Sequence, residues 1–197
     1  DDATTTIRFW AMGREAEVVA GLLREFEREH PQIRVELQQI PWTAAHEKLL
    51  TAFAADGLPD VCQLGNSWIA EFATLGTLEP LQDRVDASRV IEQADYFPGI
   101  WATNVVEGEL VGVPWYVDTR LLFYRRDLLA RAGVDAPPQS WAEWEQAMAA
   151  IMRDAGPGRH AVLMPVNEFE PQLSFALQTG DPLLRDDNGR GNFRSPG

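Results

Sequence analysis

Lysine and cysteine are almost absent from this 197-residue chain, which contains one of each, Lys48 and Cys62. A single cysteine excludes a disulfide within the chain. The three histidines are scattered without the spacing of a metal site, so no bound metal is expected. No apolar run approaches the roughly 20 residues that a membrane-spanning helix needs. The sequence also lacks a phosphate-binding glycine loop, a dinucleotide fingerprint and a serine–histidine or cysteine–histidine pattern, so no cofactor is expected.

The charge is strongly one-sided, with 30 acidic residues against 17 basic ones and a formal net charge of −13. A nucleic-acid-binding protein normally carries a basic stripe, and none is visible here, so nucleic acid is not expected as a partner. The chain begins with the polar residues DDATTT and without methionine. We expect from this a mature protein whose signal peptide has been removed, with a periplasmic or other extracytoplasmic location.

Strand and helix patterns alternate through the first half of the chain. The strands are expected over residues 5–12, 33–41 and 59–65, and the helices over 14–31, 43–57 and 66–76. Thr43 is a candidate N-cap of the second helix, and Ser140 with Glu143 forms a capping box farther along the chain. Such alternation predicts an α/β fold, with a largely parallel sheet covered by helices.

A stretch that is long for a single strand, VGVPWYVDTRLLFY over residues 111–124, follows this first region. Because Pro114 cannot donate a ladder hydrogen bond, we expect a strand that leaves one sheet and enters another. The domain prediction is therefore a first α/β lobe at 1–112, a crossover at 113–120 and a partial second α/β lobe at 121–197. This second lobe has too few strand patterns to close a sheet, with one more expected at 160–166.

The loops after the three predicted strands each carry a tryptophan among polar residues. Ligands of parallel α/β sheets bind at the carboxyl ends of the strands, where these loops meet. The residues are Trp10, Met12, Gly13 and Glu15 after the first strand, Trp42 and Thr43 after the second, and Asn66, Ser67 and Trp68 after the third. The crossover adds Trp115, Tyr116, Asp118 and Arg120. Strict alternation along a flat strand would put Trp115 on the opposite side from the other three.

Flat aromatic faces interleaved with carboxylates, amides, hydroxyls and a guanidinium match the chemistry of a sugar. Its C–H face packs on an aromatic ring, and its hydroxyls pair with the polar groups. Simpler interpretations exist for individual residues, because a loop tryptophan often packs in a core. Glu15 could serve only as a first-turn acid, and Asn66 only as a helix cap. Trp101, Trp141 and Trp144 are assigned to the core.

Four segments, in one order across nearly the whole chain, resemble the extracellular solute-binding proteins of bacterial ABC sugar importers, the group around the maltose- and trehalose-binding proteins. The segments are FWAMGREAEVVAGLLREFEREHPQIRVE, PWTAAHEKLLTAFAADGLPDVCQLGNSWIAEFATLGTLEPL, GVPWYVDTRLLFYRRDLLARAGVDAPPQSWAEWEQA and TGDPLLRDDNGRGNF. Members of that group are longer, so the chain resembles an amino-terminal half with an incomplete second lobe.

The resemblance implies a two-lobed periplasmic-binding-protein-like fold that binds a neutral oligosaccharide, expected to be a glucose-containing disaccharide, in a cleft between the lobes. It implies delivery of that sugar to membrane permease subunits, without catalysis. Its sugar contacts match Glu15, Trp42, Asn66, Ser67, Trp68, Trp115, Tyr116, Asp118 and Arg120. Secondary candidates are Trp10, Met12, Gly13 and Thr43, with Glu168, Phe169 and Gln172 in the second lobe.

Two other function classes stay open at this point. One is a glycoside hydrolase that uses Glu15 and Asp118 as paired carboxylates. The other is a fragment that acts only as an assembly module, since a half-length chain would expose apolar edges. Such edges favour self-association or pairing with a complementary carboxyl-terminal half.

Overall fold

Residues 4–165, 168–178, 180 and 191 are described by the computed structural model. The chain separates into two units, Asp1–Val117 and Asp118–Gly197. The division lies inside the stretch 113–120 that the sequence assigns to a crossover. The turn-rich tail predicted after residue 181 lies, except for Gly191, outside the described residues.

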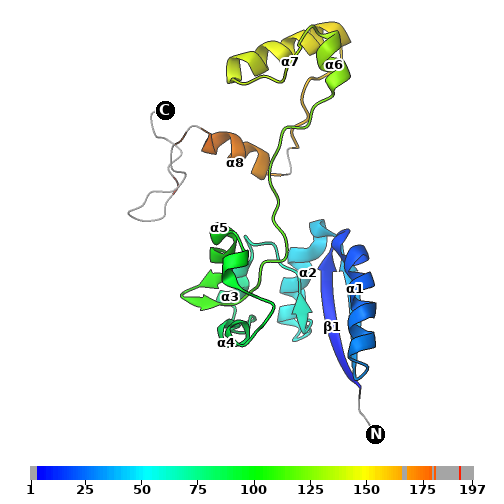
Figure 1. Cartoon of the computed structure of the whole chain (residues 1–197), viewed down its shortest axis with the longest axis vertical. Coiled ribbons are helices and arrows are strands. Elements are labelled where there is room, and N and C mark those ends of the chain that lie inside the picture. Colours follow the sequence, from blue (N-terminus) through cyan, green and yellow to red (C-terminus); the bar gives the residue numbers. More distant parts are fainter. Residues whose placement is uncertain (1–3, 166–167, 179, 181–190, 192–197) are drawn as a thin grey trace. The chain divides into compact units, whose positions relative to one another are not determined.

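A three-stranded parallel sheet forms the centre of the first unit (Figure 1). β1 (Thr5–Met12) pairs along its whole length with β2 (Ile33–Ile40), and at Phe9 and Trp10 with β3 (Val61–Cys62). The strand order is therefore β2-β1-β3, with β1 in the middle. All three predicted strands form, but β3 is shorter than predicted, because its pairing with β1 is limited to Val61 and Cys62.

Helices α1 (Glu15–Glu29) and α2 (Trp42–Ala54) follow β1 and β2 and lie on either side of the sheet (Figure 1). Successive side chains of a strand point to opposite faces, so the side chains of Ala11 and Met12 at the end of β1 lie on opposite faces of the sheet. Met12 packs with Ile40, and with residues of α2 and α3, in the main core cluster. Both Ala11 and Met12 are completely buried, which fixes the end of β1 firmly.

The start of α2 differs from the prediction. Its N-cap position is Pro41, with extended backbone and no side-chain cap, so Thr43 lies inside the first turn and does not cap the helix. Proline is well suited next to a helix start, because the first N–H groups of a helix have no partner within it. Thr43 is exposed, and its hydroxyl does not cap the start of α2.

The rest of the first unit consists of short elements, and those after α3 contribute a second core cluster of Val85, Trp101 and Leu110. Trp101 is only 4% exposed, which confirms its assignment to the core. The elements are α3 (Ile69–Thr74), α4 (Gln82–Asp86), the 3-10 helix η1 (Gln93–Asp95), α5 (Pro98–Ala102) and the hairpin of β4 (Val105–Val106) and β5 (Glu109–Leu110). Glu107 and Gly108 form the hairpin turn with positive φ angles, as a two-residue turn requires.

No strand forms over residues 111–125, so the expectation of a long crossover strand there is wrong for the described chain. A strand is held by hydrogen bonds to a neighbour, and this segment has no strand partner among the described residues. The same holds for the strand expected at 160–166, whose described residues are irregular. Apolar side chains in the first segment are consequently exposed, with Leu121 at 71% and Phe123 at 86%.

The described elements of the second unit are three helices, α6 (Arg126–Arg131), α7 (Trp141–Ala155) and α8 (Glu170–Leu177). Ser140 caps α7 as predicted, since its Oγ accepts a hydrogen bond from the N–H of Glu143 at 3.2 Å. Trp141 and Trp144 both contact the ring of Phe175 from α8. Trp141 nevertheless remains 52% exposed, so its assignment to the core is wrong, because the three helices cover only part of it.

Candidate functional site

The carboxyl ends of β1 and β2 meet at Gly13, where the backbone is held from both sides. Gly13 N–H donates to the carbonyl of Ile40 at 2.9 Å, and the side chain of Gln39 donates to the carbonyl of Gly13 at 2.7 Å. The φ angle of Gly13 is +55°, a left-handed conformation that glycine adopts without steric cost. The sequence therefore needs glycine here to turn from β1 into α1.

Two predicted site residues converge over this glycine. A Cβ at Gly13 would lie 2.9 Å from Cδ1 and 3.0 Å from Nε1 of Trp42, and 3.0 Å from Oε2 of Glu15. The indole N–H of Trp42 and the carboxylate of Glu15 thus approach the same point of the backbone. A hydrogen-bond donor and an anionic acceptor beside an aromatic face form a mixed polar and apolar corner. Because Gly13 has no side chain, Trp42 and Glu15 can approach the backbone this closely.

Trp42 also begins a row of aromatic rings. Its ring centroid lies 5.8 Å from that of Trp68, which in turn lies 5.1 Å from that of His46. The backbone at Gly65 packs against Trp68, because a Cβ there would come 3.3 Å from Cδ2 and Cε2 of the indole. Trp42 is 37% exposed and Trp68 is half-buried. Both indole rings therefore keep part of their surface accessible to a ligand.

A small open cavity of about 260 Å³ also borders Glu15. It is lined by Arg14, Glu15, Val18, Trp115 and Tyr116. Trp115 contacts Phe9 of β1 at 6.3 Å between ring centroids, and Tyr116 edge-on at 6.1 Å. Both aromatic side chains line one cavity, which departs from the alternation expected of a flat strand, because no ladder fixes this segment.

Gln63 is a residue that the sequence prediction missed. It is 7% exposed, and its Oε1 accepts a hydrogen bond from the backbone N–H of Met12 at 2.7 Å. Its Nε2 lies 3.3 Å from the hydroxyl of Tyr116, to which it donates. Gln63 thus ties the end of β1 to the Tyr116 side of the cavity. The only sequence signal is an amide within the apolar run VCQLG.

Asn66 and Ser67 lie in the turn before α3, and both are exposed. The helix begins at Ile69, with Trp68 at the N-cap position and no side-chain cap, so Asn66 does not cap it. The N–H of Trp68 is already bonded to the carbonyl of Gly65 at 2.9 Å. The helix predicted from residue 66 therefore begins three residues later than expected, and Asn66 and Ser67 stand before it with exposed side chains.

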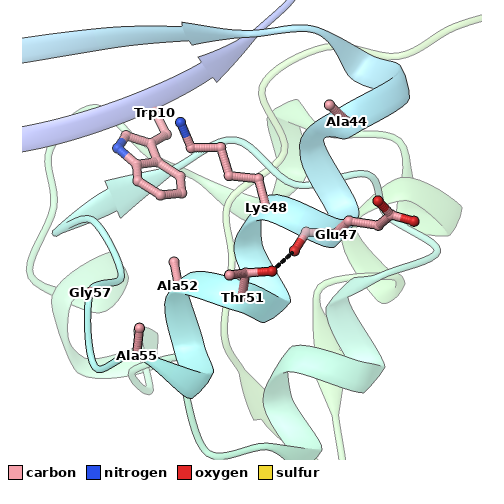
Figure 2. A pocket seen from close by; sticks show the side chains of 8 residues that line it. All are labelled: Trp10, Ala44, Glu47, Lys48, Thr51, Ala52, Ala55 and Gly57. Carbon is pink, nitrogen blue, oxygen red and sulfur yellow. Dashed lines mark hydrogen bonds between the residues drawn. The ribbon is translucent and has the colours of Figure 1, made fainter.

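Trp10, a secondary candidate, lines a different cavity of about 530 Å³ (Figure 2). Lys48 extends from α2 so that its Nζ lies 4.6 Å from the centre of the Trp10 ring, a cation–π contact. The Thr51 hydroxyl donates a hydrogen bond to the backbone carbonyl of Glu47 at 2.8 Å. The remaining lining is small and comes from Ala44, Ala52, Ala55 and Gly57. The structure thus separates Trp10 from the corner at Gly13.

Within the second unit, Arg120 lies between two carboxylates. Its nitrogens are 4.0 Å from Glu168 and 3.9 Å from Glu170, with all three side chains about half exposed. These separations exceed hydrogen-bond distance, so the pairs are loose and screened by water. Gln172 donates to the carbonyl of Pro165 at 3.1 Å, whereas Phe169 is 63% exposed. Asp118 is exposed as well.

The site chemistry is that of recognition through rings, carboxylates and amides. Burial raises the pKa of the Cys62 thiol to about 11, so it stays protonated at neutral pH and is a poor nucleophile. Among the described residues, no cluster of three histidine, cysteine or acidic side chains could hold a metal ion. Nor does the described part of the chain include a helix long and apolar enough to cross a membrane.

Comparison with known proteins gives a family and several solved structures. A family model described as bacterial extracellular solute-binding protein matches residues 9–188. The sugar-binding protein MalE from Xanthomonas citri is 67% identical, with a TM-score of 0.81 over 98% of this chain and 49% of that one. The GacH receptor of Streptomyces glaucescens, solved unliganded and with acarbose, is 31% identical, with a TM-score of 0.80 over 95% of this chain and 48% of that one.

A relative from Streptomyces antibioticus, described as an uncharacterised lipoprotein in the oleD 5′ region, is 31% identical over 191 residues. That match covers 93% of this chain and 41% of the relative. The chain therefore spans about half the length of the proteins that it matches. These likenesses confirm the predicted α/β fold of the two-lobed solute-binding-protein class, of which this chain carries about half.

Proposed function

The chain belongs to the bacterial extracellular solute-binding proteins, and we propose that it is the sugar-capturing part of an ABC importer. Its ligand is a neutral oligosaccharide, with a glucose-containing disaccharide as the specific proposal. The protein works outside the cytoplasmic membrane, in the periplasm, and hands its sugar to membrane permease subunits. It performs no chemistry on the sugar itself.

The convergence of Glu15 and Trp42 over Gly13 carries this proposal. A sugar ring has an apolar C–H face, which packs on an indole, and hydroxyls at its rim, which donate to a carboxylate. Hydrogen bonds to a charged group contribute roughly 1.5–3 kcal/mol each, so one carboxylate at the edge of an aromatic surface fixes orientation strongly. Trp68 on one side, and Trp115 with Tyr116 on the other, extend the aromatic surface beyond this corner.

An extended row of rings favours a ligand of more than one sugar unit. Trp42 and Trp68 are 5.8 Å apart at tilted angles, so one sugar ring would not cover both faces and the cavity at Trp115. The sugar-binding MalE and the acarbose-bound GacH among the similar structures support the same ligand class. The proposal also includes Asp118, Arg120 and Glu168 as sugar contacts, on the basis of the sequence resemblance.

Isothermal titration of the native gene product with a panel of disaccharides and their monosaccharide units tests this function. We expect heat of binding for at least one glucose-containing disaccharide, and much weaker heat for glucose alone. Binding only of a disaccharide without glucose would reject the specific ligand but keep the sugar-binding role. Absence of heat for every sugar in the panel would overturn the proposal as a whole.

A reducing-sugar assay on the same samples separates this function from a glycoside hydrolase that uses Glu15 and Asp118. A binding protein leaves the amount of reducing ends constant during incubation with the sugar that gives heat. A hydrolase increases it with time, and a pure assembly module gives neither heat nor turnover. The three function classes therefore predict three different pairs of results.

A further inference from the structure

Trp68 is held by contacts from three directions, and one of them comes from an ionisable ring. Gly65 packs beneath the indole, Trp42 lies 5.8 Å away, and the imidazole of His46 lies 5.1 Å away. The first two contacts are uncharged. His46 is therefore the neighbour through which an electrostatic change reaches this ring.

His46 is itself tied to α3 by a carboxylate. Its Nε2 lies 2.7 Å from Oε2 of Glu71, and because a carboxylate only accepts, the imidazole N–H donates. The edge of the imidazole also packs on the ring of Phe72 at 6.0 Å, and Phe72 is only 2% exposed. His46 belongs to α2, whereas Trp68 immediately precedes α3, which carries Glu71 and Phe72. The hydrogen bond between His46 and Glu71 thus links α2 to α3 next to Trp68.

The charged surroundings of His46 are simple in the described part of the chain. From α3 the facing groups are the carboxylate of Glu71 and the uncharged ring of Phe72, and the indole of Trp68 lies just before that helix. On α2 itself, Glu47 and Lys48 adjoin His46 in sequence, but both line the separate cavity at Trp10 (Figure 2). The charge of His46 is consequently felt mainly by Glu71 and by the indole.

We propose that His46 and Glu71 are positioning residues, which set the orientation of the Trp68 ring and so tune how tightly it packs on the bound sugar. This inference rests on the proposed sugar-binding function. A protonated imidazole forms an ion pair with the carboxylate and a cation–π contact with the indole, whereas a neutral imidazole keeps only the hydrogen bond. The two forms of the imidazole therefore contact Trp68 differently, and pH is the variable that interconverts them.

The first test needs no sugar. The indole N–H resonance of Trp68 is followed by NMR from pH 5 to 8, and is assigned by its loss in Trp68→Phe. We expect the resonance to move with pH in the unsubstituted protein and to become constant in His46→Gln. The matched control Glu47→Gln, which removes a neighbouring acid on α2, should titrate as the unsubstituted protein does. A Trp68 resonance that ignores pH would overturn the inference.

The second test uses the disaccharide that gives heat with the unsubstituted protein. Glu71→Ala and His46→Gln should each weaken binding about tenfold, and Glu71→Gln, which keeps an acceptor for His46, should restore most of the loss. Equal affinity in all variants at pH 5.5 and pH 8 would contradict the positioning role while leaving the sugar-binding function intact. If no sugar binds the unsubstituted protein, the proposed function fails, and the NMR titration still decides the role of the pair.

Discussion

The side chain of Gln63 accepts a hydrogen bond from the backbone N–H of Met12 at 2.7 Å, inside the sheet end where both residues are buried. This bond replaces a ladder partner at the point where β3 has already ended. The other end of the same amide reaches the hydroxyl of Tyr116. A single buried amide therefore connects the last residue of β1 to the aromatic residues of the small cavity.

Removing that amide should destabilise the protein. In Gln63→Leu the Met12 N–H remains buried without an acceptor, which costs about 1–3 kcal/mol of unfolding free energy. Urea denaturation measures the loss, and Gln38→Leu on the exposed side of β2 serves as the control. If the two variants unfold at the same urea concentration, Gln63 is not the structural tie inferred above.

Alanine at Gly13 should affect sugar binding more than stability. Its φ of +55° makes any L-residue unfavourable by about 1–2 kcal/mol, and the added methyl would displace Trp42 and Glu15. Gly76 has a similar φ of +68° but nothing within 4 Å of its would-be Cβ, so Gly76→Ala carries the strain alone. Gly13→Ala should therefore be at least as destabilised in urea as Gly76→Ala, and sugar affinity should be lost only in Gly13→Ala. Equal affinities would contradict the role of Gly13 in letting Trp42 and Glu15 converge.

The strand-to-helix order in the sequence was enough to predict the position of several candidate residues. Glu15, Trp42 and Trp68 each follow a strand of one parallel sheet, and the carboxyl ends of such strands meet at one edge. The structure brings Glu15 and Trp42 together on Gly13 for that reason. The prediction needed only the periodicity of the strands and helices, not their exact ends.

Contacts that depend on strand register and on strand pairing could not be predicted from the order of strands and helices in the sequence. The importance of Gln63 follows from the pairing of Trp10 with Cys62, which places Gln63 directly after β3 and beside the end of β1, where its side chain reaches the N–H of Met12. The sequence pattern also grouped Trp10 with the site, although it lies two residues before Met12 and contacts Lys48. The run at 111–124 has strand composition, but composition cannot supply the neighbour that a strand requires.

The isolated 197-residue chain should self-associate through the exposed apolar segment that includes Leu121 and Phe123. Size-exclusion chromatography should show earlier elution as the protein concentration rises, and Phe123→Ser should reduce that shift. Val90 is equally exposed at 86% but lies outside this apolar segment, so Val90→Ser is the matched control and should change little. Elution that does not depend on concentration would refute this expectation.

Asp118→Ala is the sharpest test of the proposed sugar contacts in the second unit. Loss of a charged acceptor for sugar hydroxyls should weaken affinity about tenfold or more. Asp135→Ala removes an equally exposed acid of the same unit and should leave binding unchanged. Calorimetry compares the two variants directly. Unaltered affinity in Asp118→Ala would remove this residue from the proposed site.

Glu15→Gln should separate the sugar-binding role of Glu15 from its place in the first turn of α1. The substitution keeps the size of the side chain and removes the charge, so sugar hydroxyls lose their anionic acceptor and affinity should fall about tenfold or more. An acid in the first turn also interacts favourably with the helix dipole, which contributes about 0.3–1 kcal/mol to folding. Glu17→Gln, in the same first turn, loses the same dipole interaction and serves as the control. Calorimetry and urea denaturation together should therefore give similar stabilities for the two variants, with weakened sugar binding confined to Glu15→Gln. If both variants bind sugar equally well, Glu15 acts only on the helix, and the corner at Gly13 is not where the sugar is held.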